Sequence, residues 1–479
     1  MNDHNIDSTY VLACEQAALI HLNLDSSFAV TRWPLCCSAL AIVVAACNFP
    51  RPANIDPDAA PTSDASSPSD GNDAGTPPLD SRAAAPRIVA SNTVSRADLA
   101  AGIEALLIPA GKTYVIDTDQ GSMFDATNSN APLRAAGEGL KNGVFYRTDD
   151  HNRAFFAITR IMLGENAILR GVGGRALILI SDGPIEIHGI IDVSAGHCSP
   201  SSDSVACAGP GGGRGGDTSA ARGCGPGQVG RAITGSSSGS GGGGYASPGG
   251  AGGPSVPPPV GGGGGDPMAG GAGGTGATCP GPSLDPIQGG SGGAVAATFS
   301  GVHPGGGGGG AVQLTSYTSL SIVSPTTPST SGVWAGGAGG SGGAPGGTSP
   351  ISGGGGGSGG AILLEAPAID IRSGTVLAAN GGGGGTGAAA NDGQPGRFGI
   401  APALGGEAAT GGGGAGGVGA TRDFQASDGS LGVIGTMSSA GGGGGGAGRI
   451  RINAVMLTNL SAEAVSSPAP SVNVPAATE

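Results

Sequence analysis

The chain is poor in aromatic and charged side chains, and these shortages exclude several classes of protein. Aromatic residues make up 3% and charged residues 11% of its 479 positions, whereas globular proteins carry about 25% charged residues. Lysine occurs only at Lys112 and Lys141, and the formal net charge is −13. Nucleic-acid binding needs a basic surface that neutralises phosphates, so we expect no nucleic-acid partner.

Long apolar runs are also scarce, and the run at 35–46, LCCSALAIVVAA, is too short to cross a bilayer, which takes about 20 residues. Its length suits the core of a secretory signal, and Arg32 precedes it as the positive residue. The run ends in Val44, Ala45, Ala46 and Cys47. This ending resembles the lipobox of bacterial lipoproteins, whose peptidase cuts before a cysteine that receives diacylglycerol. The resemblance implies a signal peptide at 30–46 and lipidation of Cys47, with a buried segment and a chance cysteine as the alternative.

The sequence on either side of this signal lacks the composition of a folded domain. Residues 1–29 carry acids before any apolar run, so we expect translation to start at Val30, and a precursor containing residues 1–29 in mass spectrometry would contradict this. Residues 47–86 are rich in Pro, Asp and Ser and hold few large apolar side chains. Such a segment cannot bury enough surface to offset its conformational entropy. We therefore predict a disordered N-terminus in which 47–86 is an extended tether.

Glycine is abundant and unevenly placed. Of 102 glycines, 14 precede Gly196, so the C-terminal part is compositionally separate. Runs such as 352–360 and 439–448 offer almost no side chains to pack, and glycine loses the most entropy on ordering. Either these runs are disordered, or backbone hydrogen bonds between adjacent polyproline-II-like segments, as in polyglycine II, offset that entropy.

Short β-rich runs separated by glycine fill residues 87–196 and recur later. The segment IEIHGIIDVSAG at 185–196 returns as IDIRSGTVLAANG at 369–381. Further copies begin at 310 and at 447, and the last looks truncated by the C-terminus. A unit too short to bury its own apolar face needs a stacked neighbour.

The repeats predict a mainly β fold. We expect parallel β-solenoid or β-helix-like coils interrupted by long glycine-rich loops, with an antiparallel sandwich as the alternative. The expected order is a β-rich head at 87–196, a glycine-rich repeat region with β-coils at 197–457 and a disordered tail at 458–479. Within the head, residues 95–107 fit either a helix capped by Ser95 or an extended run.

Four cysteines follow the lipobox: Cys198, Cys207, Cys224 and Cys279. An even number in an exported chain predicts two disulfides, and the sequence leaves all three pairings open. The alternative is a metal site made by His197 with the first three of these cysteines, although their spacing is not that of a zinc finger.

Candidate chemistry is sparse. The nearest carboxylate cluster is Asp182, Glu186 and Asp192, with Arg175 as its basic neighbour. We expect Glu186 and Asp192 to face outward and the flanking isoleucines 185, 187 and 191 to face the core. His188 and Ser194 lie near Asp192 in sequence, but a hydrolytic triad also needs an oriented nucleophile and an oxyanion hole.

Two weak calcium candidates come from glycine-rich nonapeptides. Asp266 lies in GGGGGDPMA and Asp217 in GGRGGDTSA, which match single repeats of the RTX type, although RTX binding needs tandem copies. We therefore predict no metal, no cofactor and no catalytic residue.

Several segments together resemble glycine-rich surface lipoproteins of myxobacteria, and more loosely the PGRS repeats of mycobacterial proteins without a PE head. They are the lipobox, the acidic stalk, IDVSAG (191–196), GAILLEAP (360–367) and LAANGGGGG (377–385). The resemblance spans most of 30–457 and implies a cell-envelope location but no reaction. Asn48 after the cysteine, by resemblance to enterobacterial sorting, permits transfer to the outer membrane.

The sequence thus predicts an exported outer-membrane or cell-surface lipoprotein with a structural or adhesive role. Its expected partners are the membrane, through the lipid, and extracellular polysaccharide or neighbouring surface proteins. Two alternatives stay open: a β-helix that binds or cleaves polysaccharide, and a calcium-stabilised exoprotein.

Overall fold

The computed structural model describes residues 88–92, 104–129, 131–196, 207–217, 220–256, 266–297, 303–324, 330–344, 350–408, 412–434, 437–460 and 464–473. These residues belong to one compact unit, Leu79–Glu479. They form strands, turns and irregular rows without an α-helix, so the predicted mainly β class is confirmed. Cys47 with the rest of the lipobox, the predicted signal and the tether lie outside the described residues.

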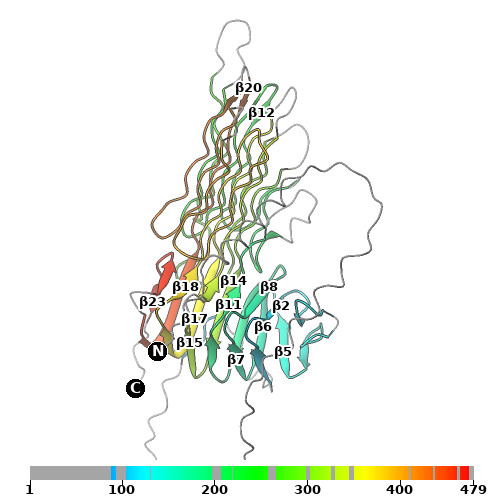
Figure 1. The fold of residues 1–479 in the computed structure, drawn as a ribbon, viewed down its shortest axis with the longest axis vertical. Helices are drawn as coiled ribbons and strands as arrows, with labels where there is room; N and C mark the ends of the chain where they lie inside the picture. Colours follow the sequence, from blue (N-terminus) through cyan, green and yellow to red (C-terminus); the bar gives the residue numbers. More distant parts are fainter. Residues whose placement is uncertain are drawn as a thin grey trace, which may run out of the picture. The chain divides into compact units, whose positions relative to one another are not determined.

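The strands form a large sheet, a smaller sheet and a short one (Figure 1). The 12-stranded sheet runs β1-β7-β10-β15-β17-β14-β9-β6-β5-β4, with β21 beside β17 and β23 beside β21. Its strands are β1 (Ala105–Ile108), β4 (Gly139–Lys141), β5 (Val144–Thr148), β6 (Arg153–Ile158), β7 (Arg160–Leu163), β9 (Ala176–Ser181), β10 (Ile185–Ile187), β14 (Ala311–Ser316), β15 (Ser319–Ile322), β17 (Ala361–Ile371), β21 (Arg449–Thr458) and β23 (Ser471–Asn473).

The second sheet has the order β22-β18-β16-β11-β8-β2-β3. Its strands are β2 (Thr113–Asp117), β3 (Met123–Asp125), β8 (Ile168–Val172), β11 (Ile190–Asp192), β16 (Ser331–Trp334), β18 (Thr375–Ala378) and β22 (Val465–Ser467). The third sheet, β12-β13-β20-β19, contains β12 (Ala232–Ile233), β13 (Ser236–Ser237), β19 (Val433–Ile434) and β20 (Met437–Ser439).

The repeated sequences lie next to one another in space. Strands β9-β10-β11, β14-β15-β16, β17-β18 and β21-β22 follow one another in groups, and each strand pairs in parallel with its counterpart in the next group. The register joins equivalent residues of the repeats: Ile185 pairs with Leu320, Leu320 with Ile369, and Ile369 with Leu457. Stacking thus gives each short unit the neighbour that it lacks alone.

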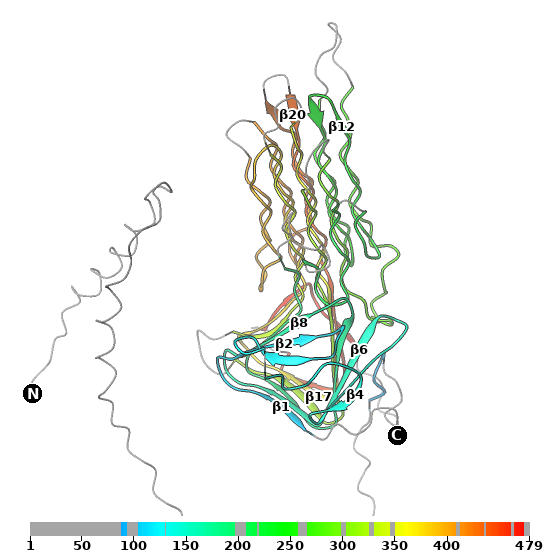
Figure 2. The same ribbon diagram turned by 90° about the vertical axis from the view of Figure 1, so that its right-hand side faces the viewer.

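One hydrophobic core lies between the two large sheets, which curve around it (Figure 2). Ile185, Ile187 and Ile191 are fully buried in it, as predicted. The central strands β6, β9 and β14 are buried at every position. A second hydrophobic cluster, which includes Phe155 and Ile178, covers the face of these strands that points away from the main core. The three strands are therefore buried on both faces. Burial on both faces explains why the apolar runs of β6 and β9 are nearly continuous.

Three expectations about the ends of the fold need correction. The fourth repeat is not truncated, because β22 continues it and pairs with β18. The prediction of a disordered tail from residue 458 is therefore wrong for residues 464–473, which contain β22 and β23. The helical alternative for 95–107 is wrong at its end, since Ala105–Ile108 is a strand paired with β7. Antiparallel hairpins, β2-β3 and β4-β5-β6, begin the stack.

Candidate functional site: the glycine array

The glycine-rich segments are ordered as long rows that run side by side from the large sheets towards the β12-β13-β20-β19 sheet (Figure 1). We call this bundle the glycine array. Its rows are 209–216, 222–231, 236–245, 247–256, 266–276, 287–297, 303–310, 335–344, 350–360, 378–389, 391–397, 401–406, 412–421, 424–432 and 437–448.

Hydrogen bonds along a row repeat every three residues. In row 350–360, Gly353, Gly356 and Gly359 donate their N–H groups to row 437–448. Gly354, Gly357 and Gly360 donate to row 335–344, and Gly355 and Ser358 donate to row 287–297. Successive residues therefore point in three directions, which is the period of a helix with about 3 residues per turn.

The same row also accepts hydrogen bonds through its carbonyl groups. The donors are Gly306 of row 303–310, Gly243 of row 236–245 and Gly382 of row 378–389. Six rows thus surround row 350–360, three as acceptors and three as donors. Backbone groups buried in this way would be costly if left unpaired, so the lattice of rows replaces the side-chain core that glycine cannot make.

Close approach between rows requires glycine. A Cβ added at Gly355 would lie 2.0 Å from the carbonyl oxygen of Gly241 in row 236–245. A Cβ at Gly357 would lie 2.0 Å from the carbonyl oxygen of Gly307, on another side of the row. In both cases the obstacle is backbone, which cannot rotate out of the way as a side chain can.

Serines interrupt the glycine runs where a backbone N–H would otherwise lack a partner. The hydroxyl of Ser358 accepts the N–H of Ser291 at 2.7 Å, and the hydroxyl of Ser291 accepts the N–H of Gly225 at 2.8 Å. At the surface, Ser430 accepts the N–H of Ala415 at 2.7 Å. These serines are therefore part of the hydrogen-bond lattice.

One surface row is protected against further pairing. Row 247–256 exposes Pro248 and Pro254, and proline has no N–H to offer. Between them, the N–H of Ala251 donates to Asp428 Oδ1 at 2.7 Å. Proline and charge are the devices that protect edge strands from adding further strands, so this row has the features of a surface that stays free.

A buried carboxylate fixes residues 88–92 to the larger sheet. Glu365 on β17 is 1% exposed, and its two oxygens accept the N–H of Ser91 at 3.1 Å. The carboxylate also accepts from Thr315 at 3.1 Å and Asn453 at 2.8 Å, which lie in register on the adjacent strands. Gln313 donates to the carboxylate and to the Ser91 carbonyl. The sequence did not indicate a role for Glu365, because the residues that it contacts are remote in sequence.

We expect Glu365→Gln to lower the free energy of unfolding by about 2 kcal/mol, because an amide N–H₂ would face donors that now bind a carboxylate. Residues 88–92 should then detach first, which limited proteolysis would detect as faster cleavage near residue 90. Glu407→Gln is the matched control, since Glu407 is exposed. Equal stability and equal cleavage rates in the wild type and Glu365→Gln would contradict this role.

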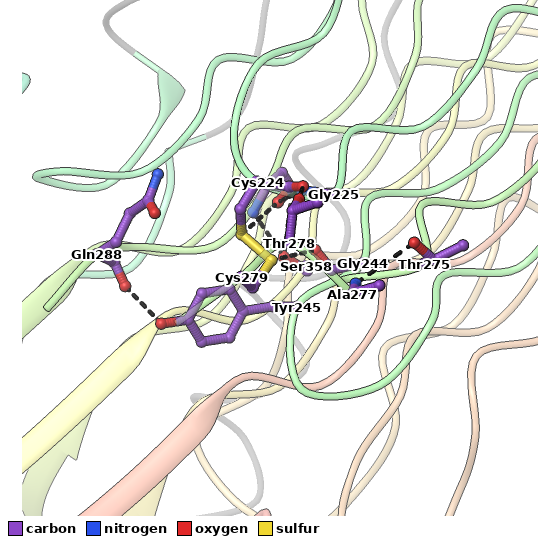
Figure 3. The surroundings of a disulfide bond; sticks show 11 residues. Cys224, Gly225, Gly244, Tyr245, Thr275, Ala277, Thr278, Cys279, Gln288 and Ser358 are labelled. Atoms are coloured by element: carbon purple, nitrogen blue, oxygen red, sulfur yellow. Dashed lines mark hydrogen bonds between the residues drawn. A yellow bond between two sulfur atoms is a disulfide. The ribbon is translucent and has the colours of Figure 1, made fainter. Parts of the chain in front are cut away.

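One of the predicted disulfides is confirmed. Cys224 and Cys279 are joined, and the bridge holds two turns of the array beside Tyr245 and Gln288 (Figure 3). A disulfide-bonded sulfur is not available as a thiolate ligand. The alternative prediction of a metal site made by His197, Cys198, Cys207 and Cys224 is therefore wrong in including Cys224. Cys207 is also disulfide-bonded and is 1% exposed, while Cys198 lies outside the described residues.

We expect the remaining bridge to be Cys198–Cys207, since the other two predicted cysteines are paired with each other. Peptide mapping by mass spectrometry without reduction should yield a crosslinked peptide that contains both residues. A crosslink from Cys207 to any other cysteine would contradict this pairing.

The predicted carboxylate cluster does not form. Glu186 lies on β10 of the larger sheet and pairs with Arg160 at 2.9 Å. Asp192 lies on β11 of the other sheet and pairs with Arg170. Arg175 is not a partner to these acids, because it pairs with Asp119 at 2.7 Å.

Asp182 is exposed at the turn after β9. The hydroxyl of Ser194 accepts a hydrogen bond from Arg170 at 3.0 Å. Within the described residues no hydrogen bond joins His188 to Asp192 or Ser194, so no triad is assembled.

The two calcium candidates lie at the ends of different rows of the array. Asp266 is exposed at the start of row 266–276, and Asp217 follows row 209–216. Within the described ranges, no three His, Cys, Asp or Glu side chains lie close enough together to hold a metal ion. Those ranges also contain no helix of the length and hydropathy needed to span a membrane.

Comparisons with known proteins return no relative for this chain. No family model matches it, and neither the curated proteins nor the solved structures include a significant match. The function of this chain is therefore inferred from its own residues and their contacts.

Proposed function

We propose that this protein is a lipid-anchored cell-envelope surface protein with a structural or adhesive role. The observation that carries the proposal is the hydrogen-bonded glycine array, in which row 350–360 bonds to six neighbouring rows. Such a lattice supplies a nearly uncharged body held together by backbone hydrogen bonds, which suits a structural element.

We propose further that the strand groups are coils of a parallel β-solenoid and that the array rows are polyglycine II helices. The in-register parallel pairing of successive groups supports the first part. The three-residue hydrogen-bond period supports the second. Hydrogen exchange tests the second, because the amides of row 350–360 should be as strongly protected as those of β14. Exchange of these glycine amides at the rate of exposed loops would contradict ordered rows.

The anchor is proposed from the lipobox, Val44-Ala45-Ala46-Cys47, and from the acidic segment that follows it. Labelled palmitate should enter the wild-type protein in the producing bacterium and should not enter Cys47→Ser. Protease added to intact cells should cut the wild-type protein, which reports surface exposure. Label-free wild-type protein, or a Cys47→Ser variant that fractionates with the membrane as the wild type does, would contradict the anchor and the outer-membrane location.

Polysaccharide binding is the second candidate function, and one observation favours it. The described part of the chain contains a pocket of mixed polar and apolar lining between the larger sheet and the base of the array.

A further inference from the structure

The pocket has a volume of about 310 Å³ and lies where two loops meet the first residue of β9, Ala176. The other residues that line it are Asp150, His151 and Asn152 from the turn before β6, Gly211 of row 209–216, and Pro286, Ile287 and Gln288 at the start of row 287–297. This volume has room for about 10 water molecules and lies at the lower end of the range for ligand sites, about 300–1,000 Å³.

Hydrogen bonds fix the two loops relative to each other. The side-chain oxygen of Asn92, a residue that is 7% exposed, accepts from Ile287 N at 2.9 Å and from Arg153 at 3.2 Å. Its amide nitrogen donates to the Leu284 carbonyl at 2.7 Å. Asp149 holds Arg153 from the other side at 2.6 Å. The turn and the loop are therefore joined through buried polar groups, and the pocket between them is formed in advance of any ligand.

The disulfide side of the array supports the same loop (Figure 3). Tyr245, which is 1% exposed, donates its hydroxyl hydrogen to the Gln288 carbonyl at 2.8 Å. Cys279, ahead of the loop, is bonded to Cys224. Because these contacts use the backbone of Gln288, its side-chain amide stays available at the pocket.

The lining disfavours several classes of ligand. No Lys or Arg lines the pocket and Asp150 contributes a carboxylate, so an anion would be repelled. No Phe, Tyr or Trp lines it, although a flat nucleobase would need a large aromatic ring for stacking. A wholly apolar ligand would strip water from Asp150, His151, Asn152 and Gln288 without replacing those hydrogen bonds.

A neutral sugar satisfies each of these conditions. Its hydroxyl groups both donate and accept, which matches a lining that includes the Gln288 carboxamide and the Asp150 carboxylate, whose Oδ1 lies 3.7 Å from His151 Nε2. The Asn152 amide nitrogen already donates to the Gly174 carbonyl at 2.7 Å, so only its oxygen is left for the sugar. Its C–H surface can contact the exposed ring of Pro286 in place of water. We propose that this pocket binds one neutral sugar residue of an extracellular polysaccharide. The inference deepens the adhesive branch of the proposed function and rests on it for the biological setting.

The test uses the full-length protein in a zwitterionic detergent, which has no sugar headgroup, and saturation-transfer NMR. The probes are the methyl glycosides of glucose, galactose, mannose and N-acetylglucosamine, with methyl glucuronide as the anionic comparison. At least one neutral glycoside should bind with a Kd on the order of 1–10 mM, since 1 mM corresponds to about 4 kcal/mol, and the glucuronide should bind more weakly than the glucoside.

Asp150→Ala and Gln288→Ala should each raise that Kd tenfold or more, because each leaves sugar hydroxyls without a partner. Asp150 is exposed and Gln288 is partly exposed, and unchanged melting temperatures would show that both changes leave the fold intact. Glu407→Ala, an exposed acid outside the pocket, should leave the Kd unchanged. The absence of transfer from all four neutral glycosides at tens of millimolar, or equal Kd values in wild type and both pocket variants, would overturn the proposal.

The anchor and the pocket can fail separately. Cys47→Ser should lose palmitate label and keep the sugar Kd, whereas Asp150→Ala should keep the label and lose sugar binding. Missing label with intact sugar binding would therefore contradict the anchor alone, and intact label without sugar binding would contradict the pocket alone.

Discussion

Replacing Gly355 with alanine is expected to lower the free energy of unfolding by about 3 kcal/mol, at the upper end of the usual cost of overpacking. The new methyl group would lie 2.0 Å from the Gly241 carbonyl oxygen. Relief requires row 236–245 to move away, which strains its bonds to row 350–360, such as Gly243 to Gly356. Denaturant unfolding followed by circular dichroism measures the change.

Gly281→Ala is the matched control for this substitution. A Cβ at Gly281 meets no atom within 4 Å, so the change in unfolding free energy should stay within about 0.5 kcal/mol. If Gly355→Ala were as stable as Gly281→Ala, the rows would not be packed against each other as described. The comparison separates close packing from the general effect of replacing glycine, which is to restrict the unfolded chain.

Arg134→Met is expected to lower the free energy of unfolding by about 3 kcal/mol, because it leaves buried carbonyl groups without donors. Arg134 is fully buried, and burial lowers its pKa. Its five N–H groups reach five backbone carbonyls, those of Gly121, Ala135, Gly137, Gly139 and Val144. None of these partners is a carboxylate, so the side chain acts as a hub that joins the turns around β3 and β4.

The neighbouring Tyr146 gives a second measurement of the same hub. The Arg134 guanidinium lies 5.1 Å from its ring centroid, and burial raises the pKa of Tyr146 to about 12. The phenol therefore stays protonated near neutral pH and donates to the Thr118 carbonyl at 2.8 Å. In Arg134→Met, Tyr146 should become more exposed, and its pKa should fall towards 10 in a spectrophotometric titration.

Arg372→Met is the control for the charge change. Arg372 pairs with Asp370 at 2.8 Å, and its side chain is 58% exposed. Exposed pairs of this kind contribute about 0–1 kcal/mol, so this variant should unfold close to the wild type. A similar loss of stability in both arginine variants would point to net charge rather than to the buried hydrogen bonds.

The repeats carried most of the information about the sheets. The alternation of isoleucines in 185–191 predicted which side chains face the core, and the return of this pattern at 369 predicted a structural copy. Ile185 and Ile369 indeed occupy equivalent positions, joined through Leu320. The pattern failed at the C-terminal end because the weakly apolar VSS of β22 lacks the β-rich signature, although parallel pairing with β18 holds it in a sheet.

The packing of the array and the buried polar contacts could not be predicted from the sequence, for a different reason. A glycine run has no side-chain pattern, so the sequence of row 350–360 does not predict that row 437–448 lies beside it. Similarly, Glu365 and Ser91 meet across 274 positions. The carboxylates 182, 186 and 192 illustrate the reverse error, because closeness along the chain did not bring them together once the chain turned from one sheet into the other.

The position of row 437–448 has a consequence for biosynthesis. This row bonds to rows 236–245, 247–256, 350–360, 378–389, 412–421 and 424–432, so it fills the middle of the lattice. Yet it is the last of the rows to leave the ribosome. A nascent chain that ends before residue 437 leaves an open slot lined by unpaired amides and carbonyls, and contacts over such long sequence separations form slowly. Assembly of the complete array must therefore await nearly complete synthesis.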